Sequence, residues 1–299
     1  MPTLIAEPLR AYTFVAASAL VLLSAVVAAT RLASAWQPIR TWLLIAPLII
    51  GALWIGSAAW TLLVTVASVM AFTEYARATG LWRERTFAVV VIAAIIAANI
   101  VAALGWTDAF TAVPILGVIG LAAVPVVRNR VDGMLPRLGL AIIGLLFFGV
   151  FLAHLSLLGH AARPIGLLLF VVLATQLNDA LAFMFGKLFG RRQWTALSPS
   201  KTVEGSLLAI GSTLVLAAAQ TPFAFPQLAW WEVAALGLAV GIGGQLGDLT
   251  MALVKRTVGI KDFGSLLPGH GGVTDRLNSL MITAPVCAYL GAWLPGMAR

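Results

Sequence analysis

The charged side chains of this chain concentrate in one segment, Gly247 to Asn278. The segment holds three carboxylates, Asp248, Asp262 and Asp275, and four cations: Lys255, Arg256, Lys261 and Arg276. Hard divalent cations such as Mg²⁺ take oxygen ligands, often one or two carboxylates with waters and substrate phosphates. Lysine and arginine bind phosphate oxygens. The segment therefore predicts a metal-dependent site that handles phosphates, with Asp248 and Asp275 as the metal ligands.

A glycine-rich turn precedes Asp275. Glycine lets the backbone turn sharply and approach a ligand closely, and successive backbone N–H groups beside cations form a phosphate cradle. We expect Gly271 and Gly272 to lie against a phosphate, and His270 to contact that phosphate or to order the loop. Asp262 belongs to the same polar run and is expected in the site. The alternative for Asp275 is to cap the helix that follows it.

Asp248 lies within an apolar run, about two turns before the run ends. A carboxylate at membrane depth is costly unless it is paired or binds a metal ion. The alternative is a structural ion pair with Lys255. That residue stands seven positions further on, beyond the three or four residues that bring helical side chains together. The spacing therefore favours a functional role for Asp248.

A second polar segment has the sequence SPSKTVEG and covers residues 198–205. Ser200 or Thr202 can cap the helix expected after it, and the positive end of that helix can hold an anion beside Lys201. Ser198 is expected in the same binding site. Glu204 is either a substrate contact or the partner in a capping box.

The third polar feature is the pair Asn178 and Asp179, which interrupts an apolar run. Polar side chains inside a membrane-spanning segment are functional candidates by default. We expect this pair to contact a base, a sugar or a metal ion.

The elements that must position these residues are apolar helices. The chain has 299 residues, of which 61% are hydrophobic and 10% charged, against about 25% charged in soluble domains. Apolar runs of spanning length predict an all-α, polytopic integral membrane protein and exclude a β-barrel. No cleavable signal peptide is expected. We expect about ten spans, at 11–30, 41–56, 58–76, 87–105, 108–127, 138–158, 164–185, 204–221, 229–254 and 279–297.

Basic residues predict the orientation of these spans. Sixteen of the 19 lie in one set of loops, which the positive-inside rule assigns to the cytoplasm together with both polar segments around the site. The net charge of +8 is thereby explained without nucleic acid, and no nucleic-acid motif is present. A single cysteine excludes an internal disulfide. We expect residues 1–137 to be a transmembrane scaffold and residues 138–299 to be the catalytic region.

The two polar motifs together resemble the phosphatidate cytidylyltransferase (CDP-diacylglycerol synthase) family. The resemblance rests on SPSKTVEG at 198–205 and on KRTVGIKDFGSLLPGHGGVTDR at 255–276, and it covers about residues 170–299. It implies a bacterial-type inner-membrane enzyme, active on the cytoplasmic face, that converts CTP and phosphatidic acid into CDP-diacylglycerol and pyrophosphate. It also implies Mg²⁺ on Asp248 and Asp275, with the basic residues and His270 on phosphates. A second cation and a homodimer are left open.

Three departures from the family pattern mark a divergent branch. Ala252 stands where a serine is usual, and Asn278 stands where an aspartate is usual. The stretch from Asn178 to Phe183 replaces the usual Asp-Thr/Ser-Gly-Ala-Tyr. The alternatives are therefore a cytidylyltransferase or kinase acting on an isoprenoid lipid, and a non-catalytic transporter or scaffold, which the glycines before Asp248 would permit.

Overall fold

The computed structural model describes residues 8–15, 17–18, 21, 36–160, 165–266 and 271–297. These residues are helical or lie in turns and loops, apart from isolated β-bridges such as the one between Gln193 and Thr202. The long helices are α2 (Trp36–Ile55), α3 (Ser57–Ala78), α4 (Arg85–Ala103), α5 (Thr107–Val127), α8 (Ile165–Phe189), α9 (Val203–Ala224) and α10 (Trp230–Thr257). The shorter elements are η2 (Leu81–Arg83), α6 (Met134–Gly144), η3 (Leu145–Phe151), α7 (Leu152–Leu158), α11 (Val273–Leu277) and α12 (Leu280–Trp293).

The predicted membrane architecture is confirmed, but the predicted number of spans is not. Seven helices among the described residues are long and apolar enough to cross a bilayer, one of them being the continuous stretch Met134–Leu158. The last expected span is reduced to α12, whose 14 residues fall short of the about 20 that a bilayer requires. Most of the first expected span, 11–30, lies outside the described residues.

The boundary between the second and third expected spans lies where the sequence places it. α2 ends at Ile55 and α3 begins at Ser57, with Gly56 between them at φ 131°. Glycine lacks a β-carbon and adopts this left-handed conformation readily, whereas other residues do so only with strain. The chain therefore reverses within one residue.

The polar motifs lie on a bundle of α8, α9, α10 and α12, which pack against one another. Small residues allow the close approach. A β-carbon at Gly205 of α9 would lie 2.7 Å from the carbonyl oxygen of Ala182 in α8, and one at Gly247 of α10 would press on the carbonyl oxygen of Asn278. Glycine therefore lets α9 approach α8 closely and lets α10 approach the backbone at Asn278, as small residues commonly do in membrane bundles.

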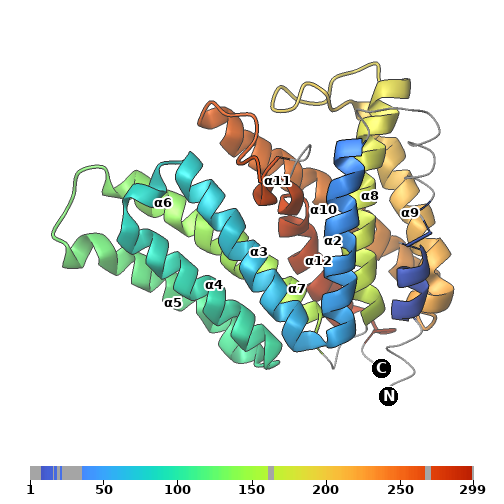
Figure 1. Ribbon diagram of the computed structural model, residues 1–299, viewed down its shortest axis with the longest axis horizontal. Coiled ribbons are helices and arrows are strands. Elements are labelled where there is room, and N and C mark those ends of the chain that lie inside the picture. The colour runs from blue at the N-terminus through green and yellow to red at the C-terminus, as the bar shows by residue number, and fades with distance from the viewer. Residues whose placement is uncertain are drawn as a thin grey trace.

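Helices α3 to α6 form a second layer beside this bundle, whereas α2 is drawn with the bundle (Figure 1). α3 and α4 pack together, and α3 also packs against α7 and the short α11. In Figure 1 the connection between α8 and α9 and the short α11 both lie toward the upper side of the molecule. The two polar segments that the sequence singles out thus lie at the same end of the fold.

Candidate active site

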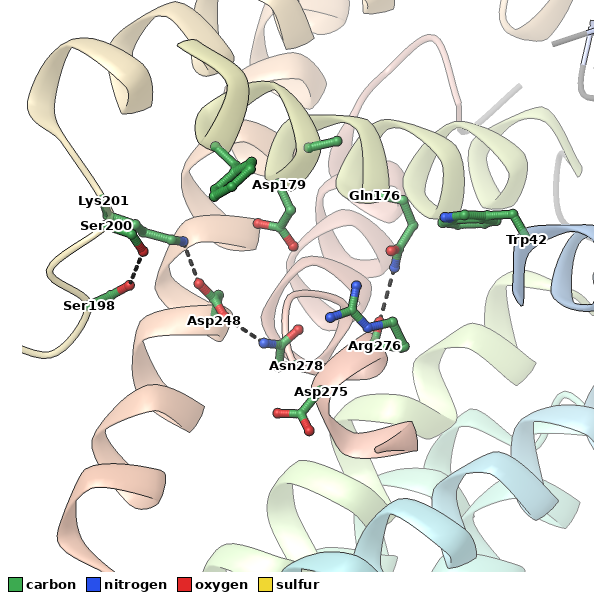
Figure 2. Close-up of a pocket in the computed structure, with 12 residues that line it drawn as sticks. Trp42, Gln176, Asp179, Ser198, Ser200, Lys201, Asp248, Asp275, Arg276 and Asn278 are labelled. Atoms are coloured by element: carbon green, nitrogen blue, oxygen red, sulfur yellow. Dashed lines mark hydrogen bonds and ion pairs between the residues drawn. The ribbon is translucent and has the colours of Figure 1, made fainter. Parts of the chain in front are cut away.

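A pocket of about 380 Å³ opens where these segments meet (Figure 2). It contains predicted site residues from both polar motifs and from α8, together with residues that the sequence analysis did not select. Its lining residues are Trp42, Gln176, Asp179, Ala180, Phe183, Ser198, Ser200, Lys201, Asp248, Asp275, Arg276 and Asn278. Carboxylates, cations and hydroxyls therefore share one cavity inside an apolar bundle.

Asp248 lies between two donors from different parts of the chain. Lys201 Nζ lies 2.6 Å from Asp248 Oδ2, and Asn278 Nδ2 donates to Asp248 Oδ1 over 2.6 Å. Figure 2 shows the three side chains in a row across the pocket. The ion pair with Lys255, weighed from the sequence as the alternative, is not formed. Asp248 is held instead by a lysine from the connection before α9.

Hydrogen bonds to both its oxygen and its nitrogen fix the orientation of the Asn278 side-chain amide. Its Oδ1 accepts from the backbone N–H of Ser279 at 2.8 Å, which leaves Nδ2 to face Asp248. The Asn278 residue is 5% exposed. An aspartate here would present an oxygen to Asp248 where this chain presents a donor, so the departure from the family pattern changes the charge of the pocket.

Asp179 points into the pocket, whereas its neighbour Asn178 does not line it. Asp179 Oδ2 accepts from the Ser279 hydroxyl, and its Oδ1 is buried without a hydrogen-bond partner. Asn178 instead donates to Thr213 Oγ1 at 2.9 Å and lines a separate apolar hollow between α8 and α9. Of this predicted pair, only Asp179 lies in the polar cavity.

Asp275 is almost fully engaged by the protein. Its Oδ1 lies 2.8 Å from Lys255 Nζ, and its Oδ2 accepts the backbone N–H groups of Phe263 at 2.9 Å and Gly272 at 3.1 Å. The contact with Gly272 is a cap on α11, the helix in which Asp275 is itself the third residue. The alternative expected from the sequence, a cap on the helix that follows Asp275, is wrong, since α12 begins after Ser279 without a side-chain cap. Asp275 nevertheless reaches the pocket wall, and both predicted metal ligands therefore border the same cavity.

Arg276 is the cation of the motif that lines the pocket directly. Its backbone carbonyl accepts from Gln176 Nε2 at 3.1 Å, which ties α11 to α8. The guanidinium lies on the pocket side of α11, beside Gln176 and Trp42 in Figure 2. A planar group with five N–H donors is well suited to a phosphate.

The SPSKTVEG segment divides between the pocket and the cap of α9. Ser198 and Ser200 line the cavity beside Lys201. Thr202 is the N-cap, accepting from Gly205 N at 3.1 Å, as expected. The capping-box prediction for Glu204 is wrong, since its carboxylate accepts the backbone N–H groups of Arg191 and Arg192 outside the pocket. It lies one position too early in the helix to reach the N-cap amide.

The remaining predicted residues lie around the pocket rather than in its lining. Arg256 is exposed and donates to the carbonyl of Leu197 over 3.4 Å, while Lys261 and Asp262 are exposed on the loop after α10. Gly271 has φ 79° in the turn before α11. His270 lies outside the described residues.

Sequence reasoning did not select Gln176, Trp42 or Glu74 for the site. Trp42 lines the pocket, and the Glu74 carboxylate accepts two backbone N–H groups of α11. The signal that was available for Glu74 and Gln176 is that each is a polar side chain within an otherwise apolar run.

The donor set is compatible with a divalent cation. Among the described residues no group of three or more His, Cys, Asp or Glu is arranged to bind a metal. Mg²⁺, however, is usually bound by only one or two carboxylates, with waters and substrate phosphates completing the coordination. Asp248, Asp275 and the free oxygen of Asp179 supply such carboxylates at one cavity.

Comparison with known proteins agrees with this geometry. The sequence profile of the cytidylyltransferase family matches residues 36–294. The chain belongs to the cytidylyltransferase family. The match extends across α2 to α12, so it includes the N-terminal helices, which lie outside the residues 170–299 that the motif resemblance covers.

Individual relatives match a shorter stretch. A phosphatidate cytidylyltransferase of Synechocystis is 44% identical over 113 residues, which are 37% of this chain and 38% of the relative. A phosphatidate cytidylyltransferase of Staphylococcus saprophyticus is 37% identical over 124 residues, 41% of this chain and 48% of the relative. An uncharacterized protein of Escherichia coli, YnbB, is 40% identical over 124 residues, 41% of each chain. The matched segments thus span less than half the length of these relatives.

Proposed function

We propose that this chain is a CTP-dependent cytidylyltransferase that converts phosphatidic acid and CTP into CDP-diacylglycerol and pyrophosphate. The observation that carries the proposal is the Lys201–Asp248–Asn278 row beside Arg276, in a pocket of a membrane bundle. Cations and carboxylates together suit a phosphate substrate and a divalent ion, and the surrounding helices suit a lipid. Family membership and the names of two relatives support the same reaction.

The reaction is a displacement at phosphorus. A phosphate-monoester oxygen of the lipid bonds to the α-phosphorus of CTP, the bond from the α-phosphorus to the bridging oxygen breaks, and pyrophosphate leaves with the electron pair. The lipid phosphate is already ionised near neutral pH, so no protein nucleophile is needed. The work left to the protein is to hold the reacting groups in line and to stabilise charge.

The polar side chains divide this work by charge. Lys201 and Arg276 would hold phosphate oxygens on two sides of the pocket, and the hydroxyls of Ser198 and Ser200 would donate beside them. Mg²⁺, held by Asp248 and Asp275, would neutralise the phosphate charge that develops during the reaction. The free oxygen of Asp179 would be available to the same ion or to a water bound to it.

The proposed location is a bacterial-type inner membrane, with the pocket on the cytoplasmic face. The support is the distribution of basic residues, since sixteen of 19 lie in the one set of predicted loops that includes both polar segments of the site. CTP would then reach the pocket from the cytoplasm, and the lipid would arrive within the inner leaflet. The two substrates would meet at the depth of Asp248.

The test is incubation of the purified protein with labelled CTP, Mg²⁺ and a panel of lipids. We expect CMP to be transferred to phosphatidic acid, and Asp248→Asn to lower kcat/KM by roughly 10²-fold or more, because a partly buried charged group is lost from the site. Asp132→Asn is the matched control, since Asp132 is exposed in the loop before α6. Full activity of Asp248→Asn, or absence of labelled lipid with every acceptor, would refute the proposal.

A second candidate is transfer of CMP to a different lipid phosphate, such as an isoprenoid phosphate. Asn278 beside Asp248, and Asn178 turned away toward Thr213, are the observations that favour it, because both depart from the family pattern near the pocket. Including isoprenoid phosphate and isoprenoid alcohol in the lipid panel separates this candidate and a lipid kinase from the first. Movement of solute without release of pyrophosphate would indicate a transporter.

A further inference from the structure

Glu74 of α3 makes a two-point contact with the first turn of α11. Its Oε1 accepts the backbone N–H of Val273 at 3.0 Å, and its Oε2 accepts that of Thr274 at 2.8 Å. The Thr274 hydroxyl donates in turn to the carbonyl of Ala71 at 2.8 Å, one turn earlier on α3. The first amides of a helix have no partner within the helix, and a carboxylate there is also favoured by the helix dipole.

The loop before α11 is shaped to admit this carboxylate. A β-carbon at Gly264 would lie 2.6 Å from Glu74 Oε1, and one at Gly272 would overlap Glu74 Oε2. Both glycines belong to the motif in the 255–276 segment. At each of them, the atoms nearest to an added β-carbon are those of the Glu74 carboxylate. The space that these glycines leave is therefore occupied by a side chain from the N-terminal half of the chain.

The element that Glu74 holds carries the pocket residues. α11 has five residues, and Asp275 and Arg276 follow directly on the two amides that Glu74 binds. A helix this short has little stability of its own, so its position depends on contacts with its neighbours. Any movement of its first turn displaces the Asp275 carboxylate and the Arg276 guanidinium together.

We propose that Glu74 is a positioning residue, which sets the place of Asp275 and Arg276 through the backbone of α11. Glu74 does not line the pocket. The N-terminal helices are thus part of the working site and not only a scaffold. This inference rests on the proposed function for its kinetic consequences, but its structural consequence can be measured without activity.

The kinetic test compares Glu74→Ala and Glu74→Gln with Thr73→Val. Glu74→Ala removes both acceptors, and we expect kcat/KM for CTP to fall roughly 10- to 100-fold, with a rise in KM and in the Mg²⁺ concentration required. Glu74→Gln keeps one acceptor oxygen and should lose less. Thr73 donates only to Val69 within its own helix, so its variant should match the unaltered protein. Equal kinetics for all four proteins would overturn the inference.

The structural test is amide hydrogen exchange in detergent or nanodiscs, without substrate. Glu74→Ala should speed exchange at Val273 and Thr274, while peptides from α9 keep their protection. Unchanged exchange at both amides would overturn the inference even if activity falls. Faster exchange in a protein that makes no CDP-lipid would support the inference and refute the proposed function, so the two failures are distinguishable.

A double-mutant cycle of Gly264→Ala and Glu74→Ala separates a positioning role of Glu74 from a general loss of stability. Gly264→Ala alone should displace the Glu74 carboxylate and reproduce most of the loss seen with Glu74→Ala. In the Glu74→Ala background the added methyl group has space, so Gly264→Ala should cost little more. Fully additive losses would contradict the proposed contact.

Discussion

Replacing Asn278 with aspartate tests how charge is balanced in the pocket. The Asn278 amide nitrogen lies 2.6 Å from Asp248 Oδ1, so the variant would place a carboxylate oxygen against another carboxylate. Two unit charges about 4 Å apart repel by about 4 kcal/mol at an effective dielectric constant of about 20. Lys201 on the other oxygen of Asp248, and the 24% exposure of the Asp248 side chain, reduce this figure.

We therefore expect Asn278→Asp to lower the free energy of unfolding by about 2–4 kcal/mol in the absence of divalent cations. At about 2 °C for each kcal/mol, the melting temperature should fall by roughly 4–8 °C. A cation bound between the two carboxylates would offset the repulsion. Adding Mg²⁺ should therefore raise the melting temperature of the variant by more than that of the unaltered protein.

The assay is thermal unfolding in detergent across a Mg²⁺ titration, with CDP-lipid formation measured on the same samples. Asn129→Asp is the matched control, because Asn129 is exposed in the loop between α5 and α6 and lies next to two arginines. The same chemical change there should leave the melting temperature within about 1 °C, as for most surface substitutions. If Asn278→Asp melts like the unaltered protein, or if Mg²⁺ protects both equally, the reasoning about the Asp248 pair is refuted.

Two further predictions concern Lys201 and the contact of α10 with α12. Lys201→Met should lower kcat/KM for CDP-lipid formation by roughly 10²-fold, because it leaves the largely buried Asp248 without its cation. Arg83→Met removes an exposed cation at the end of η2 and should match the unaltered protein. Equal rates for both variants would exclude a role for the ion pair between Lys201 and Asp248. Gly247→Ala should lower the melting temperature and the yield of folded protein, because the added β-carbon would press on the Asn278 carbonyl. The control is Gly211→Ala, where the added β-carbon has open space, and it should change the free energy of unfolding by less than about 1 kcal/mol. A stable Gly247→Ala protein would contradict the packing described for this crossing.

Much of the fold follows from the sequence because the forces that define a membrane helix are local. Apolar length predicted the helices from α2 to α10 to within a few residues, and Gly56 marked the break between α2 and α3. The same local reasoning overestimated the final span. It read residues 279–297 as one apolar run, whereas the chain folds as α12 with only 14 residues.

For the site, the sequence by itself determined which segments hold polar chemistry, because a charge in an apolar run is costly and stands out. It selected Asp248, Lys201 and Arg276, and the structure brings these residues to one pocket. It did not determine the partners. Only the tertiary structure decided that Lys201 pairs with Asp248, that Lys255 pairs with Asp275, and that Glu74 holds α11. These contacts join residues far apart in the chain, and their formation depends on how glycine-lined helices cross, which no local pattern specifies.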